Sequence, residues 1–153
     1  MSMSPMEQLA SGILLAAMTH ENQVDKSGKA YILHPLFLMN QLLFDTELAV
    51  IAILHDVIED SEGKVDIEQL AELGFSRRVT RAVNLLTHYP TESYQEYIDK
   101  ICTNIDAIRV KRKDIDHNSR TTRLKGISDK DIRRIEKYHR AFIQLGNARD
   151  SFI

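Results

Sequence analysis

The chain has 153 residues, of which 43% are hydrophobic and 27% charged, so it is long enough for one domain with a true core and excludes disordered or collagen-like compositions. A formal net charge of −2 argues against a protein whose main task is to coat nucleic-acid phosphates or an anionic membrane. The single cysteine excludes an internal disulfide and the cysteine-rich zinc scaffolds, so any metal ion must be held by histidines and carboxylates.

Helical spacing of apolar residues runs through nearly the whole chain, with few glycines and prolines and no sustained strand-type alternation. The sequence therefore predicts an all-α, compact helical bundle that forms one domain over residues 1–153, with its core at about 9–147. We expect the helices at about 5–20, from 35 onward, 45–60, 67–73, 77–88, 92–104, 106–124 and 129–147. Asp45 or Thr46 is expected to cap the third helix, Ser76 the fifth and Ser128 the last.

Targeting and membrane signals are missing from the sequence. The first basic residue is Lys26, so no basic segment precedes the apolar stretch at 13–18. The longest strongly apolar run, 48–54, is far too short to span a membrane. We expect a cytoplasmic protein without a membrane partner.

The helix predicted over 45–60 is apolar around almost its whole circumference, which is typical of a buried helix. It nevertheless carries ionisable residues near its end, and burying these is costly unless they are paired or bind a metal. In a continuous helix Glu59 would lie one turn below His55 and Asp56, and Asp60 one turn below Asp56. A ligand role is the favoured interpretation for His55 and Asp56, whereas Glu59 and Asp60 alone also fit a hydrated helix end.

Two other segments offer donors of the same kind. His34 precedes Pro35 at an expected loop-to-helix junction, where a structural capping role is the alternative. Asp114, Asn118 and Thr121 share one helical stripe, which could also be a solvated charged face.

Together these segments supply two imidazoles and two carboxylates. This mixed set of nitrogen and oxygen donors suits a divalent first-row metal such as Mn, Fe, Co, Ni or Zn, and differs from the all-oxygen sites of Ca²⁺ and Mg²⁺. Four protein ligands would leave coordination positions for water and substrate, and nearby free carboxylates could act as general acid and base. The donors are His34, His55, Asp56 and Asp114.

Three blocks of the sequence, in this order, resemble a known family. The blocks are Gln23-x-Asp25-Lys26-x-Gly28-x-x-Tyr31-Ile32-x-His34-Pro35, Leu54-His55-Asp56-x-x-Glu59-Asp60 and Val110-Lys111-x-x-Asp114-x-x-His117-Asn118. They resemble the HD-domain metal-dependent phosphohydrolases, and more closely the (p)ppGpp hydrolase domain of RelA/SpoT-type enzymes and the small single-domain alarmone hydrolases. The resemblance extends over about 14–145.

The resemblance implies a fold, a cofactor and a reaction. The fold would be an all-α HD bundle, and the reaction would remove the 3′-pyrophosphate of ppGpp or pppGpp, the alarmone nucleotides of the stringent response. The metal would be Mn²⁺, and the nucleophilic water and the proton transfer would fall to Glu59 and Asp60. By the same resemblance the metal ligands would be His34, His55, Asp56 and Asp114, and the nucleotide pocket would contain Lys26, Asn118 and Thr121.

One departure from the family bears on the substrate. Asp25 stands where these enzymes usually carry a basic residue that supports the guanine base, and a carboxylate cannot make that cation–π contact. The alternatives are therefore an HD-type nucleotidase or phosphodiesterase that acts on another nucleotide, and a non-catalytic nucleotide sensor. In each case we expect a small-molecule nucleotide and no nucleic acid as partner, and a homo-oligomer stays open.

Several residues receive only weak assignments from the sequence. We expect Arg112 to face solvent, Cys102 to be a small core residue, and His20, His88 and His139 to be surface or core histidines without local partners. The roles of Lys113, His117 and Tyr138 stay open.

Overall fold

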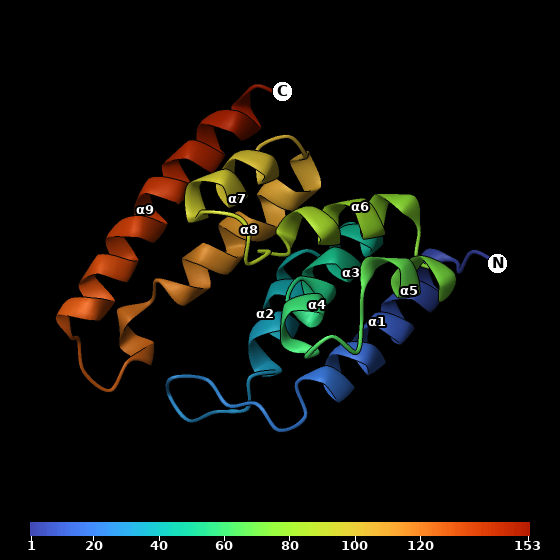
Figure 1. Ribbon diagram of the computed structural model, residues 1–153, viewed down its shortest axis with the longest axis horizontal. Helices are drawn as coiled ribbons and strands as arrows, with labels where there is room; N and C mark the ends of the chain where they lie inside the picture. The colour runs from blue at the N-terminus through green and yellow to red at the C-terminus, as the bar shows by residue number, and fades with distance from the viewer.

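The computed structural model describes residues 1–153, and it confirms the predicted all-α class. The one feature of β type is an isolated antiparallel bridge between Val24 and Ala30. The elements, labelled in Figure 1, are α1 (Pro5–Thr19), α2 (Leu33–Gln41), α3 (Thr46–Leu54), α4 (Val57–Asp60), α5 (Ile67–Glu72), α6 (Arg77–Leu86), α7 (Tyr94–Ile101), α8 (Ile105–Asn118), the 3₁₀ helix η1 (Thr121–Arg123) and α9 (Asp129–Asp150).

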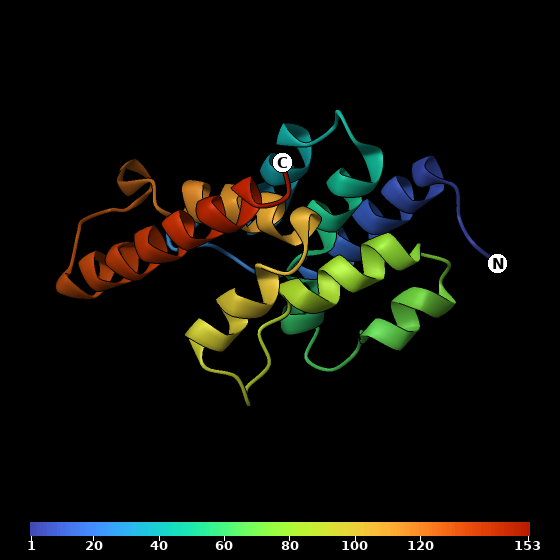
Figure 2. The same cartoon turned by 90° about the horizontal axis from the view of Figure 1, so that it is seen from above.

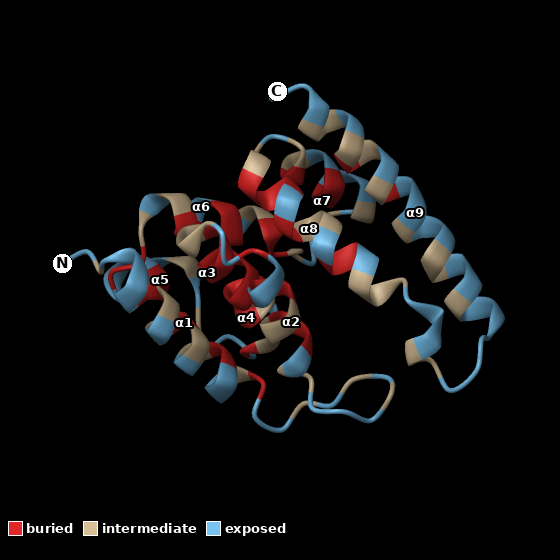
Figure 3. Cartoon of the chain, turned by 180° about the vertical axis from the view of Figure 1, so that it is seen from behind, coloured by how far each residue is buried: buried red, intermediate tan, exposed pale blue.

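Helix α3 forms the centre of the core. Every residue from Leu48 to Leu54 is fully buried, as its uninterrupted apolar sequence predicts. Helices α1, α2, α6 and α8 pack around it, and buried residues gather at this centre in Figure 3. Gly12 of α1 faces α3, and a Cβ added there would lie 3.1 Å from Ile53 Cγ2, so a glycine allows this close contact.

The predicted caps are present at the helix N-termini. The side chain of Asp45 accepts a hydrogen bond from the Leu48 backbone N–H, which decides between the two candidate caps of α3. Ser76 caps α6, and Ser128 forms a capping box with Asp131 at the start of α9. Each cap satisfies a backbone donor that the helix itself leaves free.

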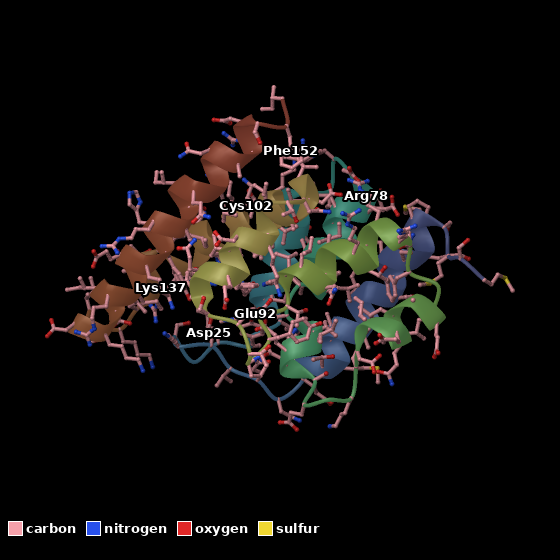
Figure 4. All side chains as sticks on the ribbon, turned by 45° about the horizontal axis from the view of Figure 1, so that its top comes forward. Asp25, Arg78, Glu92, Cys102, Lys137 and Phe152 are labelled. Atoms are coloured by element: carbon pink, nitrogen blue, oxygen red, sulfur yellow. The ribbon has the colours of Figure 1, made fainter.

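Arg78 joins three helices at the end of the molecule where α6 begins (Figure 4). Its guanidinium donates to Asp45 before α3 at 2.6 Å and to Asp106 on α8 at 2.9 Å. A longer contact of 3.5 Å reaches Glu47. This shared partner fixes the ends of α3, α6 and α8 relative to one another.

Several predicted boundaries are wrong. Helix α2 begins at Leu33 rather than at Pro35, because a proline in the first helical turn lacks only an N–H that would have no helical partner. The helix predicted over 106–124 ends at Asn118 and is followed by η1. The helix predicted over 45–60 is two helices, α3 and α4, interrupted at His55 and Asp56.

Helix α9 lies along one side of the bundle against α8 and α7, as Figures 1 and 2 show. Only Ala141 and Leu145 of this helix are buried, so its first half projects from the core. The loop that follows α1 meets the segment after α8, where Arg123 donates to Asp25 at 3.3 Å. No helix combines the length and the apolar composition required to cross a membrane.

Candidate metal centre

The break between α3 and α4 is made by the side chain of His55. In a continuous helix the Ala52 carbonyl would accept the N–H of Asp56. Here that carbonyl lies 2.7 Å from His55 Nδ1 and 3.4 Å from the His55 backbone N, and Asp56 leaves helical geometry with φ −109° and ψ 1°. The continuous helical face expected for Glu59 is therefore wrong, and the break instead turns His55 and Asp56 toward α2 and α8.

His34 and Asp114 meet although they are 80 residues apart. His34 lies in the first turn of α2, 2% exposed, and its Nε2 is 2.8 Å from Asp114 Oδ1 on α8. The other ring nitrogen, Nδ1, is 2.7 Å from His117 Nδ1, and the two rings stack with their centroids 5.0 Å apart. Both ring nitrogens of His34 thus have partners on α8, so the structure does not support the alternative that His34 only caps a helix.

Three of the four donors predicted from the sequence form one cluster, and the fourth lies beside two of them. Ligand atoms of His34, His55 and Asp56 lie within 4.8 Å of one another. Asp114 Oδ1 adds a fourth donor, 2.8 Å from His34 Nε2 and 3.6 Å from His55 Nε2. Two imidazole nitrogens and two carboxylates at this spacing suit a divalent first-row metal.

His55 carries a further sign of a cation position. Because its Nδ1–H donates to the Ala52 carbonyl, its Nε2 is directed at carboxylate oxygens, 3.0 Å from Asp56 Oδ2. That Nε2 is buried and has no hydrogen-bond partner. Burial alone would lower the pKa of His55, but Asp56 and Asp114 outweigh it and raise the pKa well above its usual value. The space between these atoms therefore favours positive charge, and the residues fit a metal cation.

Neighbouring side chains hold the two carboxylates in place. The Tyr31 hydroxyl donates to Asp56 Oδ2, and Asn118 Nδ2 donates to Asp114 Oδ1 at 2.8 Å. Lys111 Nζ, almost entirely buried, lies 2.8 Å from Asp114 Oδ2. No role was predicted for Tyr31 or Lys111. The i,i+3 spacing of Lys111 and Asp114 could have indicated their pairing, whereas Tyr31 and Asp56 are 25 residues apart.

The two carboxylates are ionised at neutral pH. Burial raises the pKa of Asp56, but the charge and hydrogen bond of His55 outweigh it and lower the pKa to about 2. Burial acts on Asp114 in the same way, and the ammonium of Lys111 holds its pKa well below the usual value. Burial and the charge of Arg123 lower the pKa of His117 to about 4, so the imidazole that stacks on His34 is neutral at neutral pH.

Glu59 and Asp60 on α4 line an open hollow of about 900 Å³ beside the end of α1. The Glu59 carboxylate accepts a hydrogen bond from the His88 backbone N–H, and Asp60 accepts one from Gln23 Nε2 at 3.1 Å. Partial burial, together with the negative charge of Asp56, raises the pKa of both carboxyl groups. A carboxylate with a raised pKa is a better proton acceptor near neutral pH.

A second hollow, of about 240 Å³, is lined in part by His34. Lys26 and Asn118, two of the three expected nucleotide contacts, line it, whereas Thr121 lies exposed on η1 and is not part of its wall. We call this space the basic hollow, because four cationic side chains line it and Asp25 is its only lining carboxylate. The other lining cations are Arg120, Arg123 and Arg134.

The structure also shows the surroundings of the residues that receive only weak assignments from the sequence. Tyr138 of α9 lines the basic hollow, and Lys113 is exposed. The expectation that Arg112 faces solvent is wrong: it donates to the Phe142 carbonyl at 2.7 Å and lies over the Phe142 ring. His20 is buried and has partners, Gln23 and Asp60, which the sequence did not suggest.

Comparison with known proteins finds relatives of the same type as those that the three sequence blocks resemble. No family model matches the chain. It is 32% identical over 126 residues to the bifunctional (p)ppGpp synthase/hydrolase SpoT of Escherichia coli K12, an alignment that covers 75% of this chain and 18% of SpoT. It is 31% identical over 119 residues to the guanosine-3′,5′-bis(diphosphate) 3′-pyrophosphohydrolase of Haemophilus influenzae, covering 71% and 18%. Over 123 residues it is 31% identical to the GTP pyrophosphokinase of Myxococcus xanthus, covering 69% and 16%. The chain thus spans less than a fifth of the length of these relatives.

Proposed function

Because the chain is homologous to the (p)ppGpp hydrolases of the RelA/SpoT type, we propose that it is a metal-dependent phosphohydrolase that removes pyrophosphate from guanosine 3′,5′-bis(diphosphate). The observation that supports this proposal is the cluster of His34, His55 and Asp56, with Asp114 beside both imidazoles. These residues come from three separate parts of the chain, and a purely structural role does not require two imidazoles and two carboxylates to share one space.

The four residues would hold one divalent cation, for which we propose Mn²⁺. When bound, such a cation supplies Lewis-acid activation of a water molecule and of a phosphoryl oxygen. Tyr31 and Lys111 each bind one carboxylate, which limits the orientations that Asp56 and Asp114 can adopt. Fixed ligands cost little reorganisation when the reaction proceeds.

Glu59 and Asp60 would handle the protons. Both lie one short helical turn after the His55–Asp56 pair, and their raised pKa values suit acceptance of a proton from water near neutral pH. We propose that one of them takes the proton of the attacking water and that the pair returns a proton to the leaving oxygen. The hollow of about 900 Å³ that they line would let water reach the centre.

The substrate would occupy the basic hollow. Cationic side chains bind phosphate oxygens, and arginine does so in a bidentate manner. Lys26 and Arg134 line this hollow, whereas the hollow beside α4 carries Glu21, Glu59 and Asp60. This difference in charge between the two hollows would favour a polyanionic substrate in the basic hollow and leave the hollow beside α4 to water.

A second candidate is the hydrolysis of a different phosphorylated nucleotide, and Asp25 favours it. Its Oδ1 accepts hydrogen bonds from Ser27 N–H and Oγ and from Lys29 N–H, and its Oδ2 pairs with Arg123. The Asp25 carboxylate offers no cation–π contact to a base, and the Arg123 guanidinium donates to Asp25 and to the His117 carbonyl. Phosphate hydrolysis is unaffected by this arrangement, but the preference for guanine is weakened.

The experiment compares metal-free and Mn²⁺-loaded protein on a panel of nucleotides. We expect Mn²⁺-dependent release of pyrophosphate from guanosine 3′,5′-bis(diphosphate). Phosphate release from nucleoside monophosphates instead would favour the second candidate. If metal is verified in the site and no nucleotide in the panel is hydrolysed, the protein is not a phosphohydrolase.

A further inference from the structure

Gln23 lies where the two hollows meet, and it is common to both of their walls. Its backbone N–H donates to the His20 carbonyl at 3.0 Å, and its carbonyl accepts from the Tyr31 N–H at 2.8 Å. These two bonds tie it to the end of α1 and to the segment that leads into α2. Its side-chain Nε2 donates to Asp60 Oδ2 at 3.1 Å.

His20 determines which way the Gln23 amide faces. This imidazole is 1% exposed, and its Nδ1 lies 2.8 Å from Gln23 Oε1. Because Oε1 only accepts, His20 Nδ1 must carry the proton, and the amide NH₂ then faces Asp60. The reversed amide would place two acceptors against each other at Asp60, so the hydrogen bonds specify one orientation.

The same cluster continues to a predicted metal ligand. The His20 ring packs against the Tyr31 ring with centroids 4.9 Å apart, and the Tyr31 hydroxyl donates to Asp56. The end of α1 is thereby connected to Asp56, which precedes α4, and to Asp60, the last residue of α4. Gln23, His20 and Tyr31 are not among the predicted metal ligands, so their contribution would be to geometry.

We propose that Gln23, oriented by His20, is a positioning residue that holds the Asp60 carboxylate at the edge of the metal centre. The inference rests on the proposed function for the role of Asp60 in proton transfer. Without the amide, the Asp60 carboxylate would be free to turn within the hollow beside α4, whose other charged lining residues are Glu21, Glu59, Glu62 and Lys64. The charged or titratable groups that act on Asp60 are Asp56, His20 and His55.

The principal variant is Gln23→Met, which keeps the side-chain length and removes the donor. Misplacing a catalytic group by about 1 Å costs up to about 100-fold in rate, so kcat should fall by about 10- to 100-fold with KM unchanged. The affinity for Mn²⁺ should equal that of the parent, because no ligand is touched. Asn22→Ala is the matched control: Asn22 is adjacent and lines only the hollow beside α4, and its variant should retain the parent kcat.

A second measurement does not depend on turnover. The titration of the Asp60 carboxyl carbon, followed by NMR in metal-free protein, should shift to higher pH in Gln23→Met, since the amide favours the ionised form. A parent protein inactive on every nucleotide would remove the proposed function, and the NMR titration would still decide whether Gln23 controls Asp60. An unchanged titration, an equal loss in Asn22→Ala, or loss of Mn²⁺ affinity in Gln23→Met would overturn the inference.

Discussion

The ion pair of Lys111 and Asp114 predicts that burial, rather than the distance between the charged atoms, decides how much an ion pair contributes to the stability of the protein. Their atoms are 2.8 Å apart with side chains 12% and 8% exposed, whereas Arg140 and Glu136 on α9 are 2.6 Å apart with side chains 78% and 60% exposed. Breaking a buried ion pair leaves an uncompensated charge and costs about 3–5 kcal/mol, while an exposed pair contributes less than about 1 kcal/mol.

The test uses Asp114→Asn and Glu136→Gln, unfolded by urea in the presence of a chelator so that metal binding does not contribute. We expect Asp114→Asn to lower the free energy of unfolding by about 3 kcal/mol, the lower end of the range, because the variant also relieves repulsion with Asp56. Glu136→Gln should change it by less than about 1 kcal/mol, and high salt should abolish that small effect. Equal losses in the two variants would refute the view that Lys111 is a buried counter-charge.

Three further predictions concern the centre and the loop beside it. Glu59→Gln should bind Mn²⁺ like the parent and lose turnover by about 100-fold or more, as measured by calorimetry and steady-state kinetics; unchanged turnover would remove Glu59 from proton transfer. If Glu59 is the member of the pair that accepts the proton, its pKa, raised above 4.5, places the acidic limb of kcat above pH 4.5, and this limb should disappear in Glu59→Gln. Asp25→Asn should speed hydrogen exchange at the Ser27 and Lys29 amides, which donate to the Asp25 carboxylate; unaltered exchange would show that the carboxylate does not order the loop.

The helical class and the candidate donors could be predicted because they depend on local features. Apolar spacing predicts helices, and the residues from Leu48 to Leu54 leave no polar face for solvent. Ser76 and Ser128 lie next to the backbone donors that they cap, so a short stretch of sequence is sufficient to identify them. The all-α class could therefore be predicted from the sequence, whereas several helix boundaries could not.

The break at His55 could not be predicted, since it is a competition for one carbonyl. Helical periodicity assumes that the Ala52 oxygen receives the Asp56 N–H, and the imidazole of His55 binds it instead. The outcome depends on the burial of that imidazole and on the partners supplied by α2 and α8. A pattern along the chain does not contain this information.

The residues that surround the donors were missed for a related reason. Lys111 resembles other members of a basic stretch, and only the packing of α8 against α7 shows that it is buried while Lys113 is exposed. His20 lacks a partner within its own helix, and its neighbours Gln23 and Asp60 come together only when the loop after α1 folds back. The partners of these side chains are determined by packing between segments that are distant in the sequence.

The claim on which the account depends is that four side chains share one cation, and crystals soaked in Mn²⁺ test it most directly. An anomalous-difference map should contain one strong peak in contact with both imidazole Nε2 atoms, of His34 and His55, and with a carboxylate oxygen from each of Asp56 and Asp114. A peak held by only one or two of these residues, or no peak between them, would contradict the claim.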